Sequence, residues 1–240
     1  MYSENKKGQV TLFVILAVVI VASILGIYVL KQQGFFSPYH VNSDVKPVYD
    51  FVRGCIEKTS NRAIYSIGLG GGYYLGENLS SLEITSYTLN GRSYAPSRAE
   101  IEEEIAKTIP TLFSECINKF NNFKEFDMIN GSLKINVSIN EENVIVGSEY
   151  PIAIKRAGSV YQISNYEPVS IPIRLGLIYN YSMEIVDTYL KTGGFGLIYL
   201  SENSTNLGFY FVDYQNYTLV DISEPIKNKN SSYEFMFALQ

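Results

Sequence analysis

The stretch VKPVYDFVRGCIEKTSNRAIYSIGLGGGYYLG (residues 45–76) decides how the folded part of this 240-residue chain is built. Residues that suit a buried face recur in it at steps of three and four, which predicts an amphipathic helix. The glycines of residues 68–72 must end that helix, because glycine disfavours regular helical structure. We expect them to form a turn or a close backbone approach, since a phosphate-binding loop needs a preceding strand and a lysine. The buried stripe is Val45, Val48, Val52, Cys55, Ile56, Thr59, Ala63 and Ile67.

A second helix is predicted to start after Ser97, where Ser97-Arg-Ala-Glu100 has the form of a capping box. Its apolar stripe continues through Pro110 without losing phase, so we expect one kinked helix. Four glutamates in its first turns favour the positive end of the helix dipole and are expected to face water rather than form a metal or acid site. The glutamates are Glu100, Glu102, Glu103 and Glu104, and the stripe is Ile101, Ile105, Ile109, Leu112, Phe113, Cys116, Ile117 and Phe120.

The remainder alternates in the manner of strands, with one further helix. A hairpin is predicted from Leu133 to Val146 around the turn Asn140–Asn143. A third helix is predicted from Leu175 to Leu190, closed by Gly193-Gly194. The fold class is therefore α+β, with two or three helices against a mainly antiparallel sheet. The other predicted strands are Tyr150–Ile154 and Val169–Leu175, both broken by prolines, and Phe195–Leu200, Leu207–Tyr214, Tyr217–Ile222 and Tyr233–Leu239.

The two cysteines, Cys55 and Cys116, lie on the apolar stripes of the first two helices. If those stripes pack together the cysteines can meet, and Gly54 would allow the close approach that a disulfide needs. A bridge would contribute on the order of 4 kcal/mol by closing a long loop. The alternative is a pair of buried free thiols acting as small hydrophobic side chains.

The segment Val10 to Leu30 carries no charge over 21 residues. At about 1.5 Å per residue it is long enough to cross a bilayer, and Lys6 and Lys7 before it favour a cytoplasmic N-terminus. The organisation expected is a leader (1–8), a transmembrane helix (9–31), a linker (32–46) and an extracellular α+β domain (47–240). An outside location is oxidising and supports the disulfide.

Seven Asn-x-Ser/Thr sequons follow the apolar segment, and none precedes it. Such a sequon marks a candidate glycosylation site in an exported chain. The alternative is that a surface rich in asparagine and serine creates sequons freely. The asparagines are Asn78, Asn130, Asn136, Asn180, Asn203, Asn216 and Asn230.

Composition argues against several function classes. The net charge is −5, and no basic cluster occurs beyond Lys6-Lys7, so we expect no nucleic-acid partner. One histidine, His40, and two cysteines are too few for a histidine-rich metal site or a zinc cluster. No nucleophile elbow, paired-cysteine motif or nucleotide fingerprint occurs, so we expect no enzyme, no cofactor and no metal.

The junction Lys6-Lys7-Gly8 followed by Gln9-Val10-Thr11 resembles the class III signal peptide of archaeal type IV pilin-like proteins. The resemblance covers about 25 residues. It implies that a prepilin-type peptidase cuts between Gly8 and Gln9 on the cytoplasmic side, and that residues 10–30 first anchor the subunit and later pack in a filament core. Phe13 stands at the fifth mature position, where many members carry glutamate. The rest of the chain is similar to uncharacterised archaeal membrane-anchored proteins.

Three hypotheses follow for function. The first is a non-catalytic pilin-like subunit of a cell-surface filament, a homopolymer through residues 10–30. The second is an unprocessed single-pass surface protein whose extracellular domain binds a ligand or another cell. The third, ranked last, is a membrane-tethered enzyme. The small residues Ala17, Ala22 and Gly26 allow close helix contact in lipid, which fits the first hypothesis and an ordinary anchor alike.

Overall fold

The computed structural model describes residues 16, 20–21, 41–75, 84–117, 123, 125–156, 158–194, 206–226 and 231–240. The chain divides into two compact units, Met1–His40 and Val41–Gln240. In the first unit, the three described residues Leu16, Ile20 and Val21 are helical. The second unit is called the head from here on.

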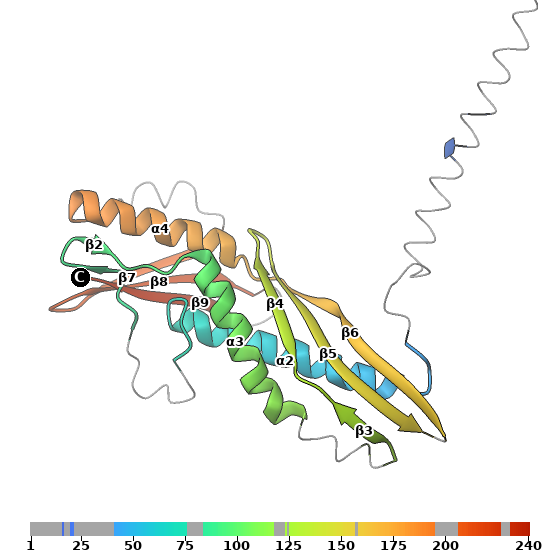
Figure 1. Ribbon diagram of the computed structural model, residues 1–240. Helices are drawn as coiled ribbons and strands as arrows, with labels where there is room; N and C mark the ends of the chain where they lie inside the picture. Colours follow the sequence, from blue (N-terminus) through green and yellow to red (C-terminus); the bar gives the residue numbers. More distant parts are fainter. Residues whose placement is uncertain are drawn as a thin grey trace, which may run out of the picture. The chain divides into compact units, whose positions relative to one another are not determined.

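The head is α+β, as predicted. Its described residues form three helices, α2 (Lys46–Leu69), α3 (Arg98–Ile117) and α4 (Leu175–Thr192). The strands form separate sheets in which every pairing between named strands is antiparallel. In Figure 1, α2 lies beneath strands of both larger sheets. It therefore joins the two halves of the core.

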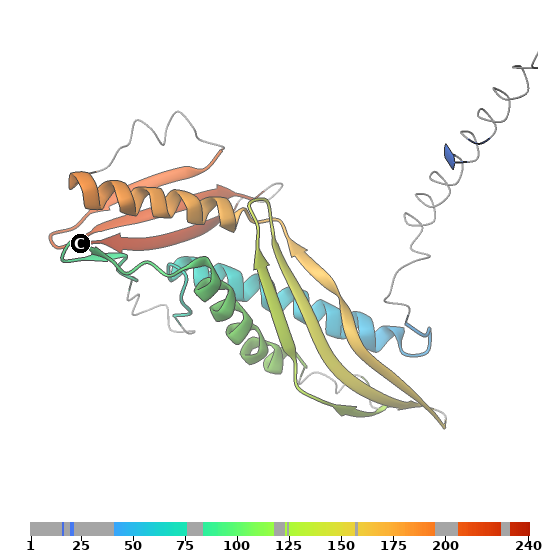
Figure 2. The same cartoon turned by 45° about the horizontal axis from the view of Figure 1, so that its top comes forward.

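The larger sheet is built around β5 (Val144–Arg156). Along one edge of β5, β4 (Lys134–Ile139) pairs with residues 144–149 and β3 (Asp127–Asn130) pairs with residues 152–155. Along the other edge, β6 (Ser159–Ile171) pairs with β5. We call this sheet the long sheet; Figure 2 shows it as a twisted layer with α2 and α3 beside it. Its inner face is aliphatic because alternate residues such as Val137, Val146 and Val169 lie opposite one another and are buried.

The prediction of short, proline-broken strands in this region is wrong. Pro151 lies inside β5 and Pro168 inside β6, and both strands run for 13 residues. The β5–β6 register shifts between Glu149 and Ile152, an interval of β5 that contains Pro151. It shifts again between Val146 and Ser148, whose partners Val169 and Tyr166 enclose Pro168 of β6. A proline lacks the N–H that a regular ladder requires, so each is accommodated at a local irregularity without ending the strand.

The second sheet has the order β7 (Gly208–Asp213), β8 (Thr218–Pro225), β9 (Ser232–Leu239). Tyr233, Phe235 and Phe237 alternate along β9 and are fully buried. Helix α4 lies along this sheet in both Figure 1 and Figure 2, with Tyr181 edge-on to Phe209 at 5.5 Å. A small hairpin, β1 (Thr88–Leu89) and β2 (Arg92–Ser93), precedes α3 and turns through Asn90 and Gly91, both at positive φ. The predicted strand Phe195–Leu200 lies outside the described residues.

Helix α2 confirms the amphipathic helix that was predicted before the glycines of residues 68–72. Its buried residues include Val48, Val52 and Ile56, and it ends as the glycines begin. Gly71 and Gly72 have positive φ, and a Cβ on Gly71 would lie 2.6 Å from the carbonyl oxygen of Met236. The glycine run is therefore both a turn and a close approach to β9, which is the alternative that the sequence favoured over a phosphate loop.

Helix α3 confirms the capping box and the continuation through Pro110. The Ser97 backbone N–H donates to Glu100 Oε2 at 2.6 Å, and the Glu100 N–H donates to Ser97 Oγ at 3.3 Å. The bond from the Ser97 backbone N–H, followed by one from the Ser97 hydroxyl to Glu100 Oε2 at 2.7 Å, lowers the pKa of the Glu100 carboxyl. Pro110 lies within an uninterrupted helix from Arg98 to Ile117.

Candidate functional site

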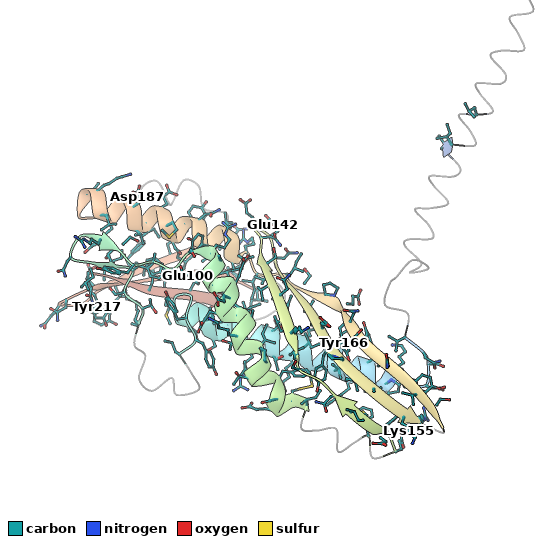
Figure 3. The ribbon with its side chains drawn as sticks, in the orientation of Figure 1. Glu100, Glu142, Lys155, Tyr166, Asp187 and Tyr217 are labelled. Atoms are coloured by element: carbon teal, nitrogen blue, oxygen red, sulfur yellow. A yellow bond between two sulfur atoms is a disulfide. The ribbon has the colours of Figure 1, made fainter. Side chains whose placement is uncertain are left out.

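A cavity of about 850 Å³ lies where the ends of several elements of the head converge. Its lining comes from the β4–β5 turn, the β6–α4 connection, the start of β7 and the end of β8. Figure 3 shows Glu142 at the β4–β5 turn, close to the start of α4. Gly176 makes this proximity possible, because a Cβ there would lie 2.5 Å from the carbonyl oxygen of Asn140. The lining residues are Glu142, Pro172, Ile173, Arg174, Asn206, Leu207, Gly208, Glu224, Pro225 and Ile226.

An ion pair between Arg174 and Glu224 forms part of the wall of this cavity. The Arg174 Nε–H donates to Glu224 Oε1 at 2.5 Å, and the Arg174 backbone N–H donates to Glu224 Oε2 at 2.9 Å. The two side chains are 20% and 11% exposed. Arg174 is also the N-cap of α4, so the carboxylate of Glu224 lies at the positive end of that helix. The pair therefore fastens α4 to β8.

A second cavity, of about 470 Å³, lies between α2 and β6. Glu57, Asn61 and Tyr65 of α2 form one wall, residues 169–172 another, and Ser231 completes the lining. Tyr65 is edge-on to Tyr233 at 5.4 Å. Burial, reinforced by the negative charge of Glu224, raises the pKa of both tyrosine hydroxyls. Pro172 lines both cavities, so both cavities border the β6–α4 connection.

The chemistry of these cavities is that of binding by hydrogen bonds and apolar contact. Their polar groups are carboxylates, amides, hydroxyls and one guanidinium, set among proline and aliphatic side chains. Within the ranges that the structure describes, no group of three or more His, Cys, Asp and Glu side chains could hold a metal ion. His40 lies outside those ranges.

No pattern in the sequence indicates these cavity residues. Arg174 and Glu224 are 50 positions apart, and neither stands in a recognisable motif. The sequence did draw attention to the four glutamates at the start of α3. The expectation that all four face water is wrong for two of them. Glu102 Oε1 accepts the N–H of Ile139 at 2.8 Å, and Glu104 Oε1 accepts the N–H of Tyr74 at 3.3 Å. These two half-buried carboxylates connect α3 to β4 and to the glycine turn.

Asp221 of β8 is a further half-buried carboxylate. Its Oδ1 is buried with no hydrogen-bond partner in the described part of the head. Burial, followed by repulsion from Glu234 on β9, raises the pKa of its carboxyl to about 6. Asp221 and Glu234 by themselves form no functional site. The raised pKa of Asp221 does predict that the stability of the second sheet depends on pH.

The predicted disulfide is confirmed. Cys55 of α2 and Cys116 of α3 are bonded, with their α-carbons 5.8 Å apart and a sequence separation of 61. The role expected for Gly54 is wrong, because Gly54 is exposed and a Cβ there would meet no atom within 4 Å. The close approach comes instead from the packed stripes themselves, with Val52 and Ile56 of α2 and Ile109 and Leu112 of α3 buried in one core.

Four of the predicted glycosylation asparagines are described, and all four are exposed. Asn130 is in β3, Asn136 in β4, Asn180 in α4 and Asn216 in the β7–β8 turn. The structure does not bring them together into one site. Asn78, Asn203 and Asn230 lie outside the described residues.

The predicted processing site, Gly8 and Gln9, also lies outside the described residues. Of residues 10–30, only Leu16, Ile20 and Val21 are described. Among the helices that are described, none is long and apolar enough to cross a membrane.

No protein-family model, no curated protein and no solved structure matches this chain.

Proposed function

We propose that this chain is a pilin-like structural subunit of a cell-surface filament, anchored in the membrane before assembly and without catalytic activity. The observation that carries the proposal is the junction of residues 6–11, Lys-Lys-Gly-Gln-Val-Thr, placed directly before an uncharged apolar segment. A cut between Gly8 and Gln9 by a prepilin-type peptidase would free that segment for packing with other copies.

The apolar segment suits both roles that the proposal gives it. Its 21 residues would span roughly 30 Å as a helix, which is the thickness of a bilayer core. The same side chains can pack against other copies, and small residues such as Ala17, Ala22 and Gly26 permit close helix contact.

Two features of the head support an outside location. The Cys55–Cys116 disulfide is of the kind that persists in oxidising compartments. Seven sequons follow the apolar segment, and the four that are described stand on exposed positions. Both features fit a head that is carried across the membrane, with the N-terminus left in the cytoplasm.

The proposal is tested by coupling processing to assembly. The full chain is expressed in a host that contains a prepilin-type peptidase, and Gly8→Val is compared with Gly54→Ala, an exposed glycine of the head whose new Cβ meets no atom, as a control. We expect filaments in electron micrographs of the parent and of Gly54→Ala. We expect none for Gly8→Val, which should stay in the membrane fraction at full length. Filaments of unprocessed Gly8→Val would contradict the proposal.

A second candidate function is an unprocessed single-pass surface protein whose head binds a ligand. The cavity of about 850 Å³ favours it, because that volume lies in the range of small-molecule sites and its lining mixes apolar and charged groups. An N-terminus that remains intact, together with a small molecule that copurifies with the head and is lost on Leu207→Trp, would favour this candidate.

A further inference from the structure

We propose that Asn136 is an N-glycosylation site, and that the face of the long sheet on which it stands is the glycan-bearing, solvent-facing surface of the head. This inference rests on the outside location in the proposed function. It goes further because it selects one sequon and assigns a role to one face of the fold.

The sequon Asn136-Val137-Ser138 lies in the extended strand β4. Residues two apart in a strand point to the same face, so Asn136 and Ser138 stand side by side. Both are exposed, whereas Val137 between them is 7% exposed and points to the core. Neither polar side chain has a hydrogen-bond partner in the described part of the head. A transferase can therefore reach the amide and the hydroxyl together.

The neighbouring strand leaves room for a sugar. Asn136 lies opposite Gly147 of β5, which has no side chain to crowd it. A Cβ built on Gly147 would meet only Asn136 itself, at 3.8 Å from its carbonyl oxygen. Lys134 and Glu149, one pair further along the same face, form an exposed ion pair at 3.7 Å. The surroundings of Asn136 are thus open, and they are polar except for Ile145, which lies opposite Ser138 and is 38% exposed.

The sequon in α4, Asn180-Tyr181-Ser182, does not expose both of the side chains that a transferase must contact. Ser182 is fully buried, and its hydroxyl donates to the carbonyl oxygen of Ile178 at 2.9 Å. Asn180 itself accepts a hydrogen bond from Arg98 at 2.8 Å through Oδ1. A transferase that acts on the folded head cannot contact the Ser182 hydroxyl, so Asn180 should remain unmodified.

The other two described sequons also differ from Asn136. The Asn130 amide donates to the hydroxyl of Tyr150 at 2.7 Å, and Tyr150 is 3% exposed, so the nitrogen that would take the sugar is already engaged by a buried side chain. At Asn216 the turn is exposed, but the Thr218 hydroxyl donates to Asp213 at 2.7 Å. Among the described sequons, Asn136 alone leaves both groups exposed and unengaged.

The modification is a group transfer from a lipid-linked glycosyl phosphate or diphosphate, which must be supplied by the cell. The Asn136 side-chain nitrogen attacks the anomeric carbon, and a nitrogen–carbon bond forms as the bond from that carbon to the phosphate oxygen breaks. The lipid phosphate leaves with the bonding electrons, and the proton lost by the amide passes to a base of the transferase. The asparagine keeps one N–H.

A sugar chain at Asn136 also fixes which side of the head can face other copies. It would cover the outer face of the long sheet along its β4 edge and keep a neighbouring subunit from packing there. In a filament, that face then points to solvent.

The test uses the full chain purified from its own cells, digested with protease and mapped by mass spectrometry. The parent is compared with Asn136→Gln, Ser138→Ala and the matched control Ser182→Ala. We expect the peptide with Asn136 to carry the mass of one or more sugar residues. The increment should be lost in Asn136→Gln and Ser138→Ala and kept in Ser182→Ala, with Asn180 bare throughout.

A bare Asn136, or a sugar on Asn180, overturns the inference. Protease added to intact cells separates this failure from that of the proposed function. If the head is cut from outside while Asn136 is bare, only the choice of site is wrong. If the head is protected from the added protease, the proposed location is wrong and this inference falls with it.

Discussion

At the scale of single residues, carboxylates hold separate elements of the head together. Glu224 receives two hydrogen bonds from Arg174 at the start of α4, and Glu102 and Glu104 of α3 receive backbone N–H groups from β4 and from the glycine turn. Charged acceptors make stronger hydrogen bonds than neutral ones, and here they satisfy backbone donors outside their own elements. The head therefore depends on a few specific side chains as well as on its apolar core.

The Arg174–Glu224 pair is tested by comparing a variant that removes one of the two charges with a double variant that removes both. Glu224→Ala should lower the free energy of unfolding by about 3–5 kcal/mol, because it leaves the guanidinium of Arg174 largely buried without this carboxylate. The double variant Arg174→Met with Glu224→Leu should be much closer to the parent, since both charges are gone. Urea unfolding of the head measures both effects. Equal losses in the single and the double variant would contradict this account of the pair.

Asp221 predicts a dependence of stability on pH. Its pKa of about 6 in the folded head lies above the unfolded value of 3.8, so folding favours the protonated form. The cost of its charge is absent below pH 3.8, appears as the pH rises through 3.8 to 6, and is full above pH 6. Asp221→Asn should therefore raise the midpoint of thermal unfolding at pH 8 by a few degrees, on the order of 2–4 °C, with a smaller gain at pH 4.

The control for this prediction is Asp127→Asn, which removes an exposed carboxylate from β3. Thermal unfolding followed by circular dichroism at several values of pH separates the two variants. A gain for Asp221→Asn that is the same at pH 4 and pH 8 would show that burial of its charge is not the cause.

These contacts could not be predicted from the sequence, for a physical reason. A hydrogen bond between residues 174 and 224 depends on how a helix start and a strand end are placed in space, and neither local pattern encodes that placement. The capping box was predictable because its two partners are three positions apart in the same turn of chain.

At the scale of elements, local periodicity was sufficient for the three helices and for the β4–β5 hairpin. Stripes with a helical period predicted α2, α3 and α4 because each helix buries one face, and the glycines marked two of their ends. The lengths of β5 and β6 do not follow from the sequence, in which Pro151 and Pro168 predict strand breaks. The two strands tolerate these prolines because the β5–β6 register shifts next to them, and the sequence of one strand alone does not reveal such a shift.

Two helical glycines give opposite predictions at this scale. Gly54 of α2 meets open space, so Gly54→Ala should stabilise the head by about 0.5–1 kcal/mol through the better helix propensity of alanine. In Gly176→Ala, the new Cβ would lie 2.5 Å from the Asn140 carbonyl oxygen, so α4 or the β4–β5 turn must move. That variant should be destabilised despite the same gain in propensity.

Chemical unfolding of both glycine variants measures this difference directly. A stabilised Gly176→Ala would show that α4 does not press on the β4–β5 turn as the structure has it. A strongly destabilised Gly54→Ala would show that the exposed side of α2 has a contact beyond those in the head.

At the scale of the whole molecule, the class of the fold and its one cross-link were predictable, but its layout was not. The α+β class followed from the mixture of periods, and the disulfide followed from two cysteines on two buried stripes. Non-local packing divides the strands into two larger sheets and a small hairpin, and it places α2 against both larger sheets. Non-local packing also forms the cavities, which lie where the ends of strands and helices meet. The proposed function therefore rests on the N-terminal sequence and not on a feature of the head.

The mass of the N-terminal peptide of the protein isolated from its own cells tests the central claim most directly. The account predicts that the mature chain begins at Gln9, as glutamine or as pyroglutamate, with residues 1–8 removed and residues 10–30 retained. A chain that still begins at Met1 or Tyr2 in the isolated surface fraction would contradict the claim that it is a processed filament subunit.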